Sequence, residues 1–117
     1  MNDSIFQTIK TMLGGYIEGD AFDNDITVAI NSVISILTQL GVGPSDGFVV
    51  TGPEQTWGDF IGDRKDLEMV KMYVFTQVRL LVDPPSNSFL IDSMKKICAE
   101  YEWRLNVEVE TPASECI

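Results

Sequence analysis

The sequence predicts an all-α fold, a small bundle of about four helices. Two observations carry this prediction: apolar residues recur at helical spacing in four segments, and glycine or proline follows each of the first three. The chain has 117 residues and is 44% hydrophobic, which suffices for one core of modest size. We therefore expect a helical domain at residues 1–106 with a long glycine-rich middle loop, followed by an extended acidic C-terminal arm at residues 107–117.

The first two helices are expected at about residues 4–13 and 25–40. Asp3 or Ser4 can cap the first, and a glycine pair ends it. The second is ambiguous, because its many β-branched residues favour a strand. Its apolar residues nevertheless recur at the helical period, and we follow the period over the propensity. The resulting stripe consists of Ile26, Ala29, Ile30, Val33, Ile34, Leu37 and Leu40.

The opposite face of this second helix is polar but uncharged. Its candidate contact residues are Thr27, Asn31, Ser35 and Gln39. No charged residue occurs between Asp25 and Asp46, whereas an exposed helix usually carries lysine and glutamate on its solvated face. Two interpretations therefore stay open, a surface for a second protein and an ordinary solvated face.

The third helix is expected at about residues 66–82 and is apolar nearly all round. Such a helix is either buried in a bundle or packed against another subunit. Its main stripe consists of Leu67, Val70, Val74, Val78 and Leu81. Met72 and Phe75 lie outside this stripe, and we take them as candidate residues of a subunit interface.

The fourth helix is expected at about residues 87–106 and is amphipathic. Its narrow apolar stripe consists of Leu90, Met94, Ile97, Cys98, Tyr101 and Leu105. Trp103 lies off the stripe, so it is either a packing residue at the rim or an anchor for another protein. Beyond the helix, Val107 and Val109 alternate with glutamates, which favours an extended arm.

Asp83, Pro84 and Pro85 separate the third and fourth helices. The prolines lack amide donors, and each disfavours helical geometry in the residue before it. Ser86 or Asn87 can then cap the next helix. We expect a fixed corner, which would give the two helices the same relative direction in every copy of an assembly.

Residues 41–65 are rich in glycine and proline and are predicted to form a loop. Within this loop, residues 48–50 can form a short strand and residues 56–61 one helical turn. A loop of about 25 residues is uncommon in so small a domain and is often functional. The alternative is that the aromatic residues of the loop fill the core. These residues are Phe48, Trp57 and Phe60.

The formal net charge of −10 argues against a protein that grips nucleic-acid phosphates, because such proteins carry clustered lysine and arginine. The chain has no histidine and none of the common catalytic or phosphate-binding motifs. We therefore expect no catalytic residue, no cofactor and no metal. A calcium loop formed by Asp20, Asp23 and Asp25 is a weaker alternative, since the spacing and closing glutamate of such loops are absent.

The two cysteines indicate free thiols in a cytosolic protein. Cys98 falls on an apolar helical stripe, and Cys116 is the penultimate residue, so a disulfide framework is not expected. The chain does not open with a basic and apolar signal peptide. No apolar run reaches the ~20 residues of a membrane span, and we expect no contact with a membrane.

Several motifs that occur together and in order carry a family resemblance. The stretch MYVFTQVRLLVDPPSNSFLIDSMKKICAEYEWRLNVEVE, residues 72–110, contains three of them: VRLLVDPP, SNSFL and EWRLNVEVE. INSVISILTQLGVGP and TWGDF occur earlier, so the likeness extends over most of the chain. These motifs resemble the small head–tail connector proteins of long-tailed bacterial viruses.

The resemblance implies an all-helical protomer without enzymatic activity and a ring of about twelve copies beneath the portal, the channel through which DNA enters the capsid. Its implied partners are other copies of itself, the portal protein, and a tail-side neck or tail-completion protein. DNA would pass through the channel without specific binding, which an acidic wall favours. The protein would lie at the head–tail joint of the virion after assembly in the host cytoplasm.

This hypothesis gives roles to the candidate contact residues. The expected subunit contacts are Thr27, Asn31, Ser35, Gln39, Met72 and Phe75. The expected portal or tail contacts are Trp103, Val107 and Val109. The alternative is an acidic protein that mimics DNA and binds a host DNA-binding enzyme. Such mimicry needs carboxylates spaced like phosphates on one surface, whereas the acids here are scattered and are absent from the middle of the second helix.

Overall fold

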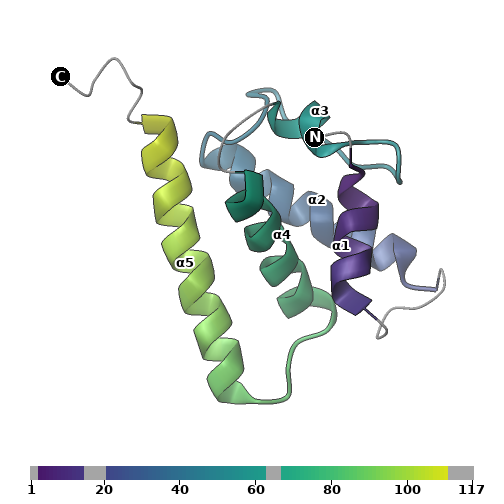
Figure 1. The fold of residues 1–117 in the computed structure, drawn as a ribbon, viewed down its shortest axis with the longest axis vertical. Coiled ribbons are helices and arrows are strands. Elements are labelled where there is room, and N and C mark those ends of the chain that lie inside the picture. The colour runs from purple at the N-terminus through teal and green to yellow at the C-terminus, as the bar shows by residue number, and fades with distance from the viewer. Residues whose placement is uncertain (1–2, 15–20, 63–66, 111–117) are drawn as a thin grey trace.

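The computed structural model describes residues 3–14, 21–62 and 67–110 of the chain. These ranges contain five helices and no strand, which confirms the all-α prediction (Figure 1). The helices are α1 (Ile5–Leu13), α2 (Asp23–Gln39), α3 (Trp57–Ile61), α4 (Leu67–Val82) and α5 (Ser88–Glu110). Four of them are the expected helices, and α3 is the helical turn predicted within the loop.

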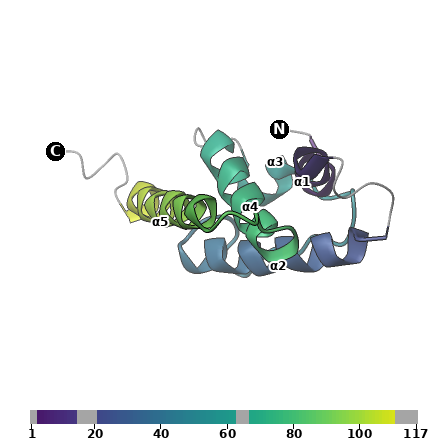
Figure 2. The ribbon, with the colours of Figure 1, turned by 90° about the horizontal axis from the view of Figure 1, so that it is seen from below.

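The helix α4 lies at the centre of the bundle and contacts α1, α2 and α5. Figure 2 shows α1 and α4 on the same side of α2, whereas α5 lies at one edge of the molecule. In Figure 1, α4 and α5 run side by side in opposite directions. Neighbours within the same chain therefore explain much of the apolar surface of α4, whereas Met72 and Leu81 remain exposed.

The core contains apolar side chains from all five helices. Its largest fully buried side chains include Trp57 and Phe60 of α3 and Tyr73 of α4. Phe48 is partly buried against this core, with its ring centroid 5.2 Å from that of Phe60. The aromatic residues of the long loop thus close the core, as the alternative interpretation predicted.

The helical period decides the conformation of α2 despite its β-branched residues. The six stripe residues within the helix are buried against the core, and Leu40 at the C-cap is partly buried. The helix begins at Asp23, two residues earlier than expected. Asp23 and Asp25 both lie in its first turn, where carboxylates stabilise the positive end of the helix dipole.

The helix α3 is fixed to the start of α1 by hydrogen bonds. The Thr56 side chain accepts from the Asp59 amide, and the Asp59 side chain accepts from the Thr56 amide, which completes a capping box. The Trp57 amide donates to the Asp3 carbonyl (3.0 Å), and its indole N–H donates to Thr8 Oγ1 (3.2 Å). The end of the long loop is therefore held in place although it contains only one helical turn.

The strand considered at residues 48–50 does not form. The Asn31 side chain of α2 takes the place of a strand partner. Its Nδ2 donates to the Val50 carbonyl (2.9 Å), and its Oδ1 accepts from the Val50 amide (2.7 Å). One side chain thus satisfies both backbone groups of Val50 without a second strand.

The proline corner lies between Val82, the last residue of α4, and Ser88, the first of α5. Asn87 is the residue that caps α5. Its Oδ1 accepts from the amides of Phe89 (2.8 Å) and Leu90 (3.2 Å). The corner and its cap agree with the sequence prediction.

The C-terminal end of α5 differs from the prediction. The helix continues through residues 107–110, so an extended arm does not begin at Val107. Residues 111–117, which include Cys116, lie outside the described part of the chain. None of the helices in the described ranges has the length and apolar composition of a membrane span.

The predicted apolar stripes of α4 and α5 are only partly buried. Met94, Cys98 and Leu105 are buried, as expected. Leu90 and Ile97 are each 42% exposed, however, and Leu81 is 60% exposed. Because α5 lies at the edge and packs mainly against α4, only a narrow strip of its surface is covered.

Gly43 allows the loop after α2 to approach α3. Its φ of +88° is left-handed, and a Cβ at this position would overlap the Phe60 ring. Gly47 provides a natural comparison, because its φ is +97° but a Cβ there would have no neighbour within 4 Å.

We expect Gly43→Ala to destabilise the fold more than Gly47→Ala. Backbone strain should cost about 1–2 kcal/mol at either position. The overlap with Phe60 should add roughly 1–3 kcal/mol at residue 43 alone. Urea unfolding followed by tryptophan fluorescence measures both variants. Equal losses of unfolding free energy would contradict the assigned Gly43–Phe60 contact.

Candidate interaction surfaces

The four candidate contact residues on α2 divide into two groups. Ser35 and Gln39 are exposed, as a subunit contact requires. Thr27 and Asn31 are partly buried. The Thr27 hydroxyl donates to a backbone carbonyl one turn earlier, and the Asn31 amide is held by Val50. The polar face of α2 is thus in part an attachment site for the chain's own loop.

The candidates on α4 also differ from one another. Met72 is 40% exposed and is accessible to another protein. Phe75 is partly buried and packs against the core. Of these two residues, only Met72 is exposed enough to contact another subunit.

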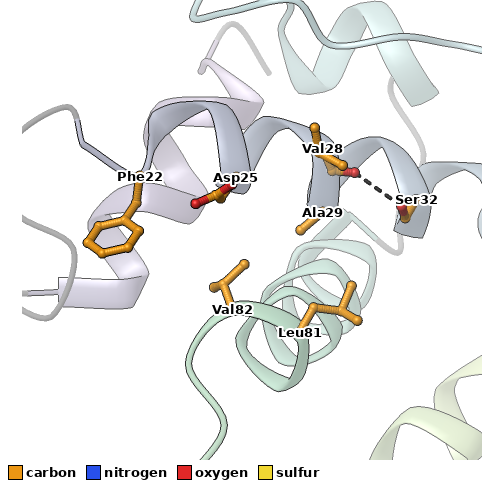
Figure 3. Close-up of a pocket in the computed structure, with 7 residues that line it drawn as sticks. All are labelled: Phe22, Asp25, Val28, Ala29, Ser32, Leu81 and Val82. Atoms are coloured by element: carbon orange, nitrogen blue, oxygen red, sulfur yellow. Dashed lines mark hydrogen bonds between the residues drawn. The ribbon is translucent and has the colours of Figure 1, made fainter.

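A groove of about 450 Å³ lies between the first half of α2 and the end of α4 (Figure 3). We call it the α2–α4 groove; it is lined by Phe22, Asp25, Val28, Ala29, Ser32, Leu81 and Val82. Figure 3 shows Ala29 of α2 on the side where Val82 projects from α4, whereas Val28 lies at the rim of the groove on the outer side of α2. Three of its apolar side chains remain well exposed, Phe22 at 48%, Val28 at 57% and Leu81 at 60%.

Sequence reasoning missed this groove. Val28 lies among the polar residues of α2, seven residues before Ser35, and Leu81 belongs to the stripe predicted for the third helix. The available signal was an apolar residue on the uncharged side of α2. That signal does not reveal which other helix lies beside Val28, because the crossing of α2 and α4 is a tertiary feature.

The outer side of α5 carries a second set of exposed apolar residues. Phe89 is 78% exposed and Trp103 is 67% exposed. Trp103 is therefore accessible to a partner, consistent with its place off the stripe. Val107 is partly buried, and the side chain of Val109 lies outside the described part of the chain.

A polar cluster joins α4 to α5. The hydroxyl of buried Tyr73 donates to Glu102 Oε2 (2.7 Å), and Gln77 Nε2 donates to both the Tyr73 hydroxyl (3.2 Å) and Glu102 Oε2 (3.4 Å). Burial raises the pKa of Tyr73, and the hydrogen bond to Glu102 raises it further. Burial also raises the pKa of the Cys98 thiol, to about 11, with a smaller effect of the Glu102 charge.

This chemistry is that of a structural contact. A catalytic cysteine needs a lowered pKa and access to substrate. Cys98 is 3% exposed, and the pKa of its thiol is raised. At the far end of α5, the Asn106 side chain donates to the Leu40 carbonyl after α2 (3.3 Å). The cluster and this bond orient the long helix on the bundle.

The acidic segment does not bring its candidate ligands together in the described residues. The Asp23 carboxylate pairs with Lys10 Nζ at 2.7 Å. Asp25 is exposed at the α2–α4 groove, and Asp20 lies outside the described part of the chain. Across the described ranges, no three potential metal ligands form a group.

Comparison with known protein families shows the family to which the chain belongs. A family model described as "Phage connector protein" matches residues 5–112, nearly the whole chain. Neither the curated proteins nor the solved structures gave a match. The match confirms the family that the sequence motifs indicated.

We expect Asn31→Ala to destabilise the protein and Ser35→Ala to leave its stability nearly unchanged. Loss of the Asn31 amide removes both hydrogen bonds to Val50 and should cost about 1–3 kcal/mol. Ser35 is exposed on the same helix, and its replacement should change the unfolding free energy by less than about 0.5 kcal/mol. Denaturant unfolding compares the two variants. A neutral Asn31→Ala variant would mean that the loop does not depend on this side chain.

Proposed function

Because the chain belongs to the phage connector protein family, we propose that it is a structural subunit of the joint between a phage head and its tail. The family match over residues 5–112 is the observation that carries this proposal. The protein would act mechanically, by holding neighbouring proteins in place, and it would catalyse no reaction. In the finished virion it would lie at the head–tail joint, after assembly in the host cytoplasm.

The finer part of the proposal concerns the assembly. We propose that about twelve copies form a ring that docks beneath the portal protein, extends the DNA channel and offers the tail-side protein a docking surface. Two exposed apolar regions, the α2–α4 groove and the outer side of α5, support an assembled state. Soluble monomers rarely leave such surfaces uncovered. The capped corner between α4 and α5 supports it too, since it would fix the direction of α5 in every copy.

The charge of the chain suits a channel through which DNA slides. With a net charge of −10, the protein repels phosphates instead of binding them. A basic channel wall would hold DNA through many phosphate contacts and slow its passage. DNA is therefore proposed as a passing neighbour and not as a ligand.

The proposed contact residues differ in how accessible they are to a partner. Trp103 is the strongest candidate for contact with the portal or tail protein, because a tryptophan exposed at 67% can be buried by a partner. Val107 and Val109 belong to the same proposed contact. For contacts between copies, Ser35, Gln39 and Met72 are accessible. The remaining three candidates, Thr27, Asn31 and Phe75, are largely engaged within the chain.

Electron microscopy of particles from a virus that lacks this gene tests the connector role. We expect free tails together with heads that either have lost their DNA or hold it without a tail. Intact particles with normal tails would refute the role and would favour the alternative of a regulatory protein that mimics DNA.

The variant Trp103→Ala tests the finer assignment. We expect normal unfolding free energy, because the side chain is mostly exposed, together with a reduced yield of tailed particles. Val49→Ala is a matched control, since Val49 is an apolar residue exposed at 62% in the loop before α3. Equal yields of tailed particles from both variants would remove Trp103 from the contact.

A further inference from the structure

The helix α5 is the longest of the bundle but contributes few side chains to the core. Among its described side chains, three are buried, Met94, Cys98 and Leu105. The shorter α4 has five buried residues and is covered by α1 and α2 as well as by α5. Because most of the core comes from elements other than α5, α1 to α4 keep most of their apolar contacts when α5 is not in place.

The polar attachment of α5 depends mainly on one carboxylate. Three hydrogen bonds join α5 to other elements in the described ranges, and two of them end on Glu102 Oε2, from the Tyr73 hydroxyl (2.7 Å) and Gln77 Nε2 (3.4 Å). The third is the neutral bond from Asn106 to the Leu40 carbonyl (3.3 Å). No ion pair between described residues joins α5 to another helix. Since a charged acceptor forms the stronger hydrogen bonds, Glu102 is the main polar anchor of α5.

The proline corner separates the backbone hydrogen bonds of α4 from those of α5. The Asp83 amide donates to the Arg79 carbonyl (2.8 Å) and completes the last turn of α4. The helix α5 begins with its own cap, in which Asn87 Oδ1 accepts from the Phe89 amide (2.8 Å). The two prolines between them lack amide donors. The helix α5 can therefore leave its place without breaking a backbone hydrogen bond of α4.

We infer that α5 is a releasable strap, which leaves α4 as a unit while α1 to α4 stay folded, and that Glu102 is the latch that holds it closed. Elements with few buried apolar contacts are those that open locally in folded proteins. The released segment loses much of its helical structure, because a helix without tertiary contacts is only marginally stable in water. The inference concerns the single chain and does not depend on the connector role.

Cys98 provides a natural probe of this release. Its side chain is 3% exposed, and burial raises the pKa of its thiol to about 11. Thiol reagents react with the exposed thiolate, so Cys98 is protected while α5 is docked. Release of α5 exposes the thiol to solvent and restores its ordinary reactivity.

The rate at which a thiol reagent labels Cys98 tests the inference. The full-length protein would carry Cys116→Ser, which leaves Cys98 as its only cysteine. The matched control carries Val33→Cys together with Cys98→Ser and Cys116→Ser, because Val33 is 1% exposed in α2. Each rate is divided by the rate for the same protein unfolded in urea. We expect Cys98 to be labelled at least about tenfold faster than the Val33→Cys thiol. Its labelling should also accelerate less with added urea, because release of α5 exposes less surface than global unfolding.

Two results would overturn the strap. Equal normalised rates with the same dependence on urea would show that Cys98 becomes accessible only when the whole chain unfolds. Fast labelling of Cys98 that does not respond to urea at all would show a small local fluctuation around the thiol and not the departure of a helix.

A second measurement addresses the latch. Glu102→Gln keeps the shape of the side chain but replaces the charged acceptor with a neutral one, and it should raise the normalised labelling rate of Cys98 by about tenfold. Tyr73→Phe removes the donor and should act in the same direction. The double variant should be labelled no more than about twice as fast as the faster single variant, because both changes break the same hydrogen bond.

Asp92→Asn is the matched control for the charge of Glu102. Asp92 is exposed on α5, and its replacement should leave the labelling rate unchanged. Equal rates for Glu102→Gln, Asp92→Asn and the parent protein would reject Glu102 as the latch. Fully additive effects of Tyr73→Phe and Glu102→Gln would reject the hydrogen bond between them as the contact that holds α5.

Discussion

The burial of α4 against three other helices is the constraint on which the rest of the structure depends. Val70, Val74 and Val78 are fully buried, and each such side chain stabilises the fold by roughly 1.5–3 kcal/mol. The helix also supplies Tyr73, whose ring is in the core and whose hydroxyl reaches α5. Because α1, α2 and α5 all pack on it, a change in the position of α4 would uncover apolar surface on every one of them.

The helix α5 has the opposite character. It is the longest helix, yet it packs mainly against α4, so most of its circumference remains available. The Tyr73–Glu102 hydrogen bond and the Asn87 cap orient it without covering it. A rigid helix with exposed aromatic residues at the edge of a small bundle is well suited to contact neighbouring proteins.

These features fit a connector in which the buried residues fix the positions of the helices and the exposed residues contact other proteins of the assembly. The long loop is a candidate functional segment in the sequence, but it packs Trp57 and Phe60 into the core. The proposed assembly contacts come instead from the helices, where Met72 of α4 and Trp103 of α5 remain exposed. The acidic composition, with a net charge of −10, disfavours contacts with the phosphates of DNA.

The sequence by itself determined the helices, the proline corner and the family, because period, caps and motifs are local features. The β-branched α2 was predicted correctly since its apolar spacing follows the helical period over 17 residues. Only the tertiary structure decided which apolar residues are covered. Leu81 and Ile97 lie on predicted stripes yet remain exposed, and Asn31 lies on a predicted interface yet holds Val50. The physical reason is that burial depends on which helices cross, and a single helix does not encode how many neighbours it will have.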